Sequence, residues 1–345
     1  MASQKVFLNP RTRQEVLVTF RPFRPEDAAG FHACVEDYYR GGYPYTQYLD
    51  AGYLWPRIQE GRMAVLLGED SSGTILSTTG VLFDSIFPGS SLLLLRVVRE
   101  AFQGIGIGTW HEKLLFEELE KHRVCSLYAD VMTQNTTSQT SLERRGFVTT
   151  GIRLLLYKAN LMLPYRNYSA ESRLSQAVMC RKGSLDFTPR LYCPRDLQEP
   201  ISRIYRSLGV DAELLDVPLE KKKGLSAGSI LTETWEEEHQ SLIWVVPEIG
   251  EDFPEKLRQQ THRSGLQILV HLVYLNLCSP GAQIGWEALV REGYFFSGIK
   301  ALGQREEYLM MTRLSGIPLN GDILHLTPQG QAFFRKIQEL SPWPA

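Results

Sequence analysis

The chain has 345 residues, of which 43% are hydrophobic and 22% charged, and its formal net charge is −2. This near-neutral balance gives no reason to expect a nucleic-acid partner, and the length favours two domains. No run approaches the ~20 apolar residues of a membrane span, and the N-terminus lacks the apolar core of a signal peptide. The five cysteines form no C-x-x-C pair and the seven histidines do not cluster. We therefore expect a cytoplasmic protein that has no membrane association, disulfide framework or metal site.

Hydrophobic periodicity in the first half predicts alternating strands and helices, which together form a mixed α/β sheet. The expected strands are 16–23, 62–70, 73–86, 90–98, 124–133, 148–162 and 175–183. The expected helices are 24–40, 47–60, 109–123 and 136–147. Between the first two helices lies a loop with Tyr43, Tyr45 and Tyr48, which either forms an aromatic wall for a ligand or packs as an ordinary helix connection.

The second half repeats this pattern in a weaker form. It predicts a strand and a helix within 186–209, strands 241–250 and 266–277, helices 251–265 and 281–295, and a strand hairpin over 295–316. The segment "GYFFSGI" follows its helix as "GFVTTGI" follows a helix in the first half. This match suggests an internal duplication. We place a boundary near Gly183, which divides the chain into lobes 1–184 and 185–345.

A glycine-rich corner, "FQGIGIGTW", joins the apolar strand 90–98 to the helix that follows it. Backbone N–H groups and the dipole at a helix start attract anions, and glycine lets a phosphate approach closely. The Rossmann spacing G-x-G-x-x-G fails at its third position, and no Gly-Lys-Ser/Thr closes a P-loop. The spacing that matches is Gln103-x-x-Gly106-x-Gly108. The alternative is a structural turn that only needs small residues.

This corner resembles the acyl-CoA pyrophosphate loop of the GNAT superfamily of N-acyltransferases. The segment "NTTSQTSLERRGF" is similar to a second family signature, Asn-x-x-Ala-x-x-x-Tyr-x-x-x-Gly-Phe, with Asn135, Ser138, Gly146 and Phe147 in register. The order of elements in 14–183 is also similar to that fold. The resemblance implies a GNAT fold made of two tandem lobes, with acetyl-CoA or another short acyl-CoA as co-substrate.

By position, the resemblance implies a cofactor site in the first lobe, with the pantetheine arm between the strand before the loop and the strand after the helix. The amides that would cradle the pyrophosphate belong to Gln103, Gly104, Ile105, Gly106, Ile107 and Gly108. The backbone of Val97 and Val98 would bond the pantetheine and polarise the thioester carbonyl. Asn135 would bond a pantetheine amide or cap the following helix, and Ser138 lies in register beside it.

Acylation of an amine needs a base to remove a proton. Asp130 occupies a place where relatives carry a carboxylate, and Glu100 is the other candidate; the alternative for both is a solvated surface acid. The tyrosine that serves as general acid in the family falls on Leu142, which cannot donate a proton. Either another hydroxyl serves, from Tyr128 or the Ser138 and Ser141 pair, or the thiolate leaves unaided, or catalysis is weak.

The second lobe has no such loop. Its corresponding turn, "VPEIGEDFPEKL", has one glycine, Gly250, and acids that would repel a pyrophosphate. It resembles the degenerate second lobe of two-lobed bacterial GNAT-like proteins, so we expect it not to bind CoA. We expect it instead to shape an acceptor cleft or to bind a protein partner.

Two functions follow from these features. The first is an N-acyltransferase that moves acetyl from acetyl-CoA to a primary amine of a small molecule or protein. The second is a non-catalytic acyl-CoA-binding regulator that engages a protein partner. Leu142 favours this second function. A third, an aminoacyl-tRNA-dependent transferase, is disfavoured by the intact loop and the absence of a basic surface.

Overall fold

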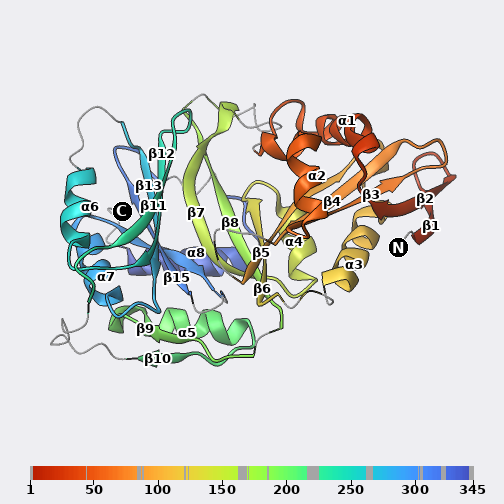
Figure 1. Cartoon of the computed structure of the whole chain (residues 1–345). Coiled ribbons are helices and arrows are strands. Elements are labelled where there is room, and N and C mark those ends of the chain that lie inside the picture. Colours follow the sequence, from red (N-terminus) through yellow and green to blue (C-terminus); the bar gives the residue numbers. More distant parts are fainter. Residues whose placement is uncertain are drawn as a thin grey trace. The chain divides into compact units, whose positions relative to one another are not determined.

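A computed structural model of the chain describes residues 3–43, 45–83, 87, 89–119, 122, 124–161, 169, 171–184, 186–215, 225–261, 267–301, 303, 306–319 and 324–341 (Figure 1). Contacts divide the chain into two compact units. Unit 1 comprises Met1–Ile86, Ser90–Val124 and Ala159–Ser172, and unit 2 comprises Phe87–Gly89, Cys125–Lys158 and Arg173–Ala345. No helix of the described segments is long and apolar enough to cross a membrane.

Unit 1 is an antiparallel sheet with helices on both faces. Its strands pair in chain order, as β1 (Ser3–Asn9), β2 (Gln14–Pro22), β3 (Met63–Glu69), β4 (Ile75–Leu82) and β5 (Ser90–Val98). Helices α1 (Ala28–Tyr39) and α2 (Ala51–Gln59) cover one face, and α3 (Ile107–Leu119) covers the other (Figure 1). Because helices lie on both sides, every residue of β4 is buried.

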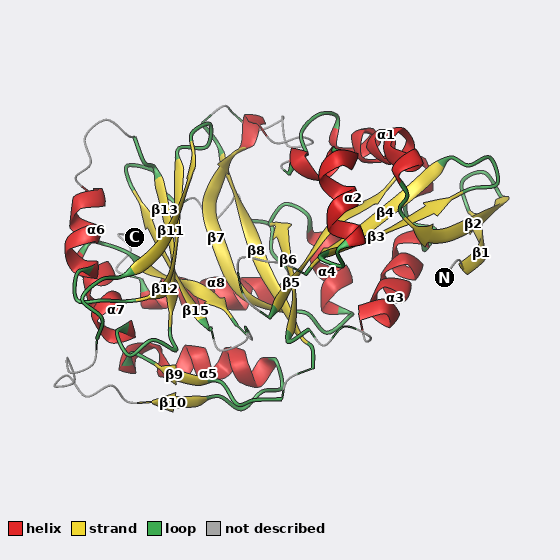
Figure 2. Cartoon of the chain, in the orientation of Figure 1, coloured by secondary structure: helices red, strands yellow, loops and turns green. Residues whose placement is uncertain are grey.

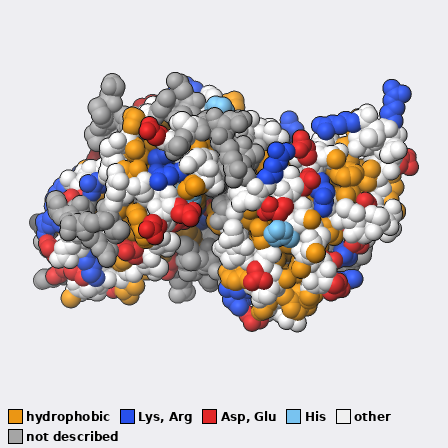
Figure 3. All heavy atoms as spheres, turned by 90° about the horizontal axis from the view of Figure 1, so that it is seen from above, with side chains coloured by type: hydrophobic (Ala, Val, Ile, Leu, Met, Phe, Trp, Pro, Cys, Tyr) orange, Lys and Arg blue, Asp and Glu red, His pale blue; other side chains and the backbone are white. Residues whose placement is uncertain are grey.

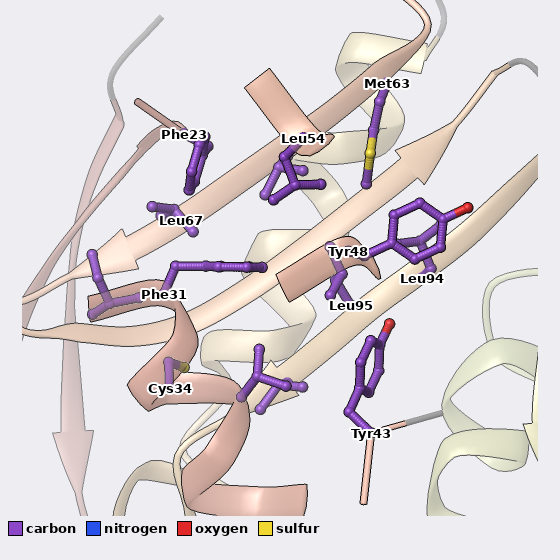
Figure 4. Packing of buried hydrophobic residues seen from close by; sticks show 14 of the residues in the cluster. Phe23, Phe31, Cys34, Tyr43, Tyr48, Leu54, Met63, Leu67, Leu94 and Leu95 are labelled. Carbon is purple, nitrogen blue, oxygen red and sulfur yellow. The ribbon is translucent and has the colours of Figure 1, made fainter. Parts of the chain in front are cut away.

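The core between α1, α2 and this sheet is aromatic and aliphatic. Figure 4 shows Tyr43 and Tyr48 beside Leu94 and Leu95 of β5. The two tyrosines are only 5% and 7% exposed, and Tyr45 packs against the same cluster. These rings therefore pack as a helix connection would, and they stabilise the unit by apolar burial.

Unit 2 contains eight strands in one mixed sheet. They pair in the order β6 (Ser126–Met132), β8 (Arg173–Lys182), β7 (Val148–Lys158), β14 (Phe295–Lys300), β15 (Tyr308–Leu314), β13 (Val270–Asn276), β12 (Ser241–Glu248) and β11 (Ile230–Glu236). The helices are α4 (Thr136–Glu143), α5 (Gln198–Ser207), α6 (Phe253–Thr261), α7 (Ala282–Arg291) and α8 (Pro328–Leu340). Figure 2 shows α6 and α7 side by side, and the short strands β9 (Arg190–Tyr192) and β10 (Glu213–Leu215) pair separately.

The same series of seven elements occurs twice along the chain. The first copy is β4, β5, α3, β6, α4, β7 and β8, and the second is β11, β12, α6, β13, α7, β14 and β15. The matching strands β7 and β14 pair with each other antiparallel, and Gly151 lies directly opposite Gly298. These glycines hold the same place in "GFVTTGI" and "GYFFSGI". Equivalent residues therefore face each other across this joint, as a local two-fold axis requires.

The predicted mixed α/β fold is confirmed, and most predicted elements lie within a few residues of the observed ones. Three strands and one α-helix among the described residues went unpredicted: β1, β10, β11 and α8. In β1 the apolar side chains of Val6 and Leu8 are exposed and the polar side chain of Asn9 is buried. Strand prediction expects apolar residues on the buried face, so this pattern hides the strand. The helix expected at 109–123 begins earlier, at Ile107.

The predicted lobe boundary stays a prediction. It divides the chain by its repeated elements, whereas the compact units follow contact density and place β6, α4, β7 and β8 with the second half. The two divisions differ because a repeat can share a sheet with its neighbour. Ser184 is described, and residue 185 lies outside the described residues.

Candidate functional site

The glycine corner is held in place by its isoleucines. Ile107 is 1% exposed in a cluster with Phe7, Phe20 and neighbouring apolar residues, and Ile105 packs against that cluster. Gly104 and Gly106 alternate with these side chains and are exposed. The apolar residues thus anchor the loop, while the glycine backbone faces outward.

Two of the three glycines are required by the backbone itself. Gly104 has φ +82° and Gly106 has φ +98°, in the left-handed region that favours glycine. Gly108 has no such φ, and a Cβ there would lie 3.4 Å from Val98 Cγ2, an ordinary contact. The protein's own structure therefore tolerates a side chain at Gly108. Glycine there would also let a ligand approach the backbone closely.

The start of α3 directs backbone donors toward the same place. The amides of Ile107 and Gly108 fall in the first turn of α3, where a helix supplies no acceptor for N–H groups. The helix dipole adds about half a positive charge at this end. Successive amides in a glycine turn form an anion-binding concavity. The corner can therefore hold a phosphate or pyrophosphate through its backbone.

Strand β5 changes direction just before this corner. Its pairing with β4 shifts register between Thr78 and Gly80, and Leu95 has φ +55°. Such a bulge re-aims the backbone and is common beside functional sites. Gln103 Nε2 donates to the Val98 carbonyl oxygen at 3.0 Å, which ties the loop to the strand end. Val97 and Val98, the predicted pantetheine contacts, are thus positioned by a bulge on one side and Gln103 on the other.

Two lysines converge on the first turns of α3. Lys5 Nζ lies 3.8 Å and Lys113 Nζ 4.5 Å from the centroid of the Trp110 ring. Lys5 belongs to β1, whose Phe7 is within 4 Å of the Cβ position of Gly106. These cations were not predicted as site residues, because nothing in the sequence places β1 beside the loop. They place positive charge over Trp110, on the first turns of α3.

The matching corner of the second copy, between β12 and α6, is closed by the chain itself. The Gly250 amide donates to Ser229 Oγ at 2.8 Å, and a Cβ on Gly250 would lie 2.5 Å from the Gly228 carbonyl carbon. Asp252 Oδ1 accepts from both the amide and the hydroxyl of Ser229, each at 2.7 Å. An anion at this corner would meet the Asp252 carboxylate, whose pKa is lowered chiefly by hydrogen bonds from Lys256 and Ser229 that outweigh burial.

The strands beside this second corner are also closed. Strands β12 and β13 pair in parallel from Ser241 opposite Val270 to Val246 opposite Leu275. This continuous pairing leaves no room for a pantetheine arm between them, because a ligand would have to replace the ladder hydrogen bonds. That the second lobe does not bind CoA stays a prediction.

Asp130, the predicted base, lies in a charged group inside unit 2. Its side chain is 5% exposed, and Oδ2 pairs with Arg153 Nη1 at 2.9 Å. Arg153 Nε also donates to the Tyr274 hydroxyl at 2.7 Å. Asp130 Oδ1 is buried and accepts no hydrogen bond from any described residue. One carboxylate oxygen is therefore held by the arginine, and the other has no donor among the described residues.

The remaining predicted residues have varied surroundings. Tyr128 is fully buried, its hydroxyl donates to the Ala301 carbonyl, and burial raises its pKa well above the ordinary value. Asn135 caps α4, where its Oδ1 accepts from the Ser138 amide at 3.0 Å. The Glu100 side chain is 72% exposed and forms a loose pair with Arg40 at 3.7 Å. Leu142, at the family's tyrosine position, is fully buried.

The structure thus brings the loop residues, Val97 and Val98 together within unit 1, and Tyr128, Asp130, Asn135 and Ser138 within unit 2. Sequence reasoning missed Arg153 and Lys300. A signal existed, because "TTGIR" and "FSGIK" each place a cation two residues after the paired glycine. Among the described segments, no group of three or more His, Cys, Asp or Glu residues is placed to hold a metal ion. On the face in Figure 3, acidic and basic side chains are interspersed.

No family model matches the chain, and no curated protein sequence matches it. About half of the chain is similar to solved acetyltransferase structures. A ribosomal-protein-alanine N-acetyltransferase from Brucella melitensis is 20% identical over 47% of this chain and 98% of its own, with a TM-score of 0.39. An N-acetyltransferase from Staphylococcus aureus is 16% identical over 48% and 98%, with a TM-score of 0.39. The protein yncA of Salmonella typhimurium, solved with its cofactor acetyl-CoA, is 18% identical over 50% and 97%, with a TM-score of 0.40.

The resemblance to N-acetyltransferases expected from the sequence is thus found among solved structures, at low identity and over about half of the chain. The TM-scores are low, so the function proposed below rests on the residues of this chain.

Proposed function

We propose that the chain is an acyl-CoA-dependent N-acyltransferase whose β5–α3 corner holds the pyrophosphate of acetyl-CoA or another short acyl-CoA. The observation that carries this proposal is the open glycine corner: two left-handed glycines, outward-facing amides and a helix start in one place. The contrast with the self-closed β12–α6 corner supports it. Lys5 and Lys113 fit the 3′-phosphate of the cofactor as nearby cations.

In the proposed reaction a primary ammonium loses one proton to a base, for which Asp130 remains our candidate. The amine nitrogen then forms a bond to the thioester carbonyl carbon, the carbon–sulfur bond breaks, and the thiolate takes the second proton from nitrogen to leave as free CoA thiol. The acceptor is a small-molecule or protein amine. A protein partner of the second lobe and a cytoplasmic location remain predictions.

Calorimetric titration of acetyl-CoA tests the proposal, followed by release of free CoA thiol against a panel of amines. Four of the five cysteines are buried, which keeps the background from the protein's own thiols low. Binding together with thiol release is the expected result. Binding without release on every amine would favour the second candidate, a regulator that binds acyl-CoA, which the buried Leu142 supports. Absence of binding would reject both functions.

A further inference from the structure

The joint between the two copies brings two equivalent cations into one buried region. Gly151 of β7 lies opposite Gly298 of β14, and two residues further along each strand stand Arg153 and Lys300. Residues two apart in a strand share a face, so both side chains project on the face of the paired glycines. The Arg153 side chain is 12% exposed and Lys300 is 4% exposed.

The two cations are compensated unequally. Arg153 has the Asp130 carboxylate at 2.9 Å and the Tyr274 hydroxyl at 2.7 Å. Lys300 makes no hydrogen bond or ion pair with any residue that the structure describes. Its Nζ lies 3.5 Å from the centroid of the Tyr128 ring and 5.1 Å from that of Phe87. Aromatic faces attract a cation, but they do not accept all three of its N–H bonds.

Lys300 still carries its charge at neutral pH. Burial lowers its pKa to about 8, and Asp130 opposes that shift while Arg153 adds to it. A buried ammonium without an acceptor is costly, as is a buried carboxylate oxygen without a donor. Asp130 Oδ1 is such an oxygen. Among the described residues one group therefore has no acceptor and its neighbour has an oxygen with no donor, so a molecule with both would satisfy the pair.

We propose that Lys300 and Asp130 bind a small amino carboxylate, a free amino acid or a close analogue. Lys300 Nζ pairs with its carboxylate, Asp130 Oδ1 accepts an N–H from its amine, and the Tyr128 and Phe87 rings contact its carbon stem. The inference rests on the proposed function in one respect: this amine is then the acyl acceptor. The binding itself needs no cofactor, so it can be tested alone.

The experiment measures binding of each standard amino acid to the full chain without CoA, by calorimetry and by thermal shift. Each amino acid is compared with its decarboxylated amine, for example tyrosine with tyramine. We expect at least one amino acid to bind, and its decarboxylated amine to bind about tenfold or more weakly, the loss of one ion pair. The Lys300→Met variant should lose this preference for the amino acid over its decarboxylated amine, and the Lys300→Arg variant should keep part of it.

Asp130→Asn is expected to weaken binding of the amino acid and of its amine alike, because it removes the acceptor for the amine. Lys182→Met, at an exposed lysine of the same unit, serves as the control and leaves binding unchanged. If no amino acid binds, or if Lys300→Met keeps the preference, the inference is wrong and ordered water satisfies the pair. Binding of acetyl-CoA without binding of any amino acid rejects this site alone. If the chain binds an amino acid but does not bind acetyl-CoA, the proposed function is rejected and the site is kept.

Discussion

The β5–α3 corner and the β12–α6 corner hold the same place in two copies of one series of elements, yet they differ in what their backbones can accept. The first has exposed Gly104 and Gly106 and a helix that begins at Ile107. The second donates its Gly250 amide to Ser229 and adds the Asp252 carboxylate. A repeated fold therefore does not carry a repeated site, because a few residues decide whether a helix start is open to a ligand or capped by its own chain.

Arg153 and Lys300, the two cations beside the paired glycines of β7 and β14, differ in the same way. Arg153 of the first copy is paired with Asp130, while its counterpart Lys300 has the Tyr128 and Phe87 rings beside its Nζ and makes no ion pair with any described residue. Equivalent positions thus carry a satisfied charge in one copy and an unsatisfied one in the other.

Removal of the two cations should change stability in opposite directions. Arg153→Met leaves the buried Asp130 carboxylate unpaired and should lower the free energy of unfolding by about 3–5 kcal/mol at pH 7. Lys300→Met removes a buried ammonium group, and burial lowers the pKa of this lysine from 10.5 to about 8. The substitution should therefore raise the free energy of unfolding by up to about 3 kcal/mol. Urea unfolding without added amino acids measures both values.

The Lys300→Met gain should depend on pH. Between about pH 8 and 10.5 the unfolded chain binds a proton at this lysine that the folded chain does not, so the wild type gains stability as the pH rises through this range. The advantage of Lys300→Met should therefore be full below pH 8 and nearly absent at pH 10.5. An advantage that stays constant over this range would show that packing, and not charge, causes it.

Closing the first corner should abolish cofactor binding. Gly106→Asp places a carboxylate and a Cβ at a left-handed position beside the expected pyrophosphate, so acetyl-CoA should bind at least about 100-fold more weakly. Calorimetry measures the loss. Gly61→Asp is the matched control, because Gly61 also has a positive φ, +69°, and open space around it. Normal acetyl-CoA binding by Gly106→Asp would refute the loop assignment.

The second corner should matter for stability and not for the cofactor. Asp252→Ala removes the acceptor for the Ser229 amide and hydroxyl and should cost about 1–2 kcal/mol in urea unfolding. Glu251→Ala, at the exposed neighbouring acid, should change little. Acetyl-CoA should titrate to one site per chain in the wild type and in both variants. A second site in any of them would contradict the closed corner.

The lysines around Trp110 should give the smallest effect. Lys5→Met and Lys113→Met should each weaken CoA binding about two- to fivefold at low salt, because exposed ion pairs are worth at most about 1 kcal/mol. Binding of 3′-dephospho-CoA should be unchanged, since that ligand lacks the charge they would meet. If both variants lose as much affinity for 3′-dephospho-CoA as for CoA, these lysines contact another part of the cofactor or only stabilise the fold.

The sequence by itself determined the features that depend on neighbouring residues. Strand 90–98, the helix after it and the glycine corner between them were readable, because periodicity and glycine spacing act over a few residues. The repeated "GFVTTGI" and "GYFFSGI" segments also indicated the second copy. The sequence also predicted the strand that carries Asp130 and the capping of α4 by Asn135, but it could not supply the partners of Asp130.

Only the tertiary structure decided the contacts between distant residues. Pairing of Gly151 with Gly298 brings Lys300 into the region of Asp130, 170 positions earlier in the chain, and β1 carries Lys5 to Trp110. The second corner is closed by Ser229, which precedes Gly250 by 21 residues. Such contacts follow from strand order and register, which local propensity does not encode. For that reason the surroundings of Lys300, on which the proposed site depends, could not be predicted from the sequence.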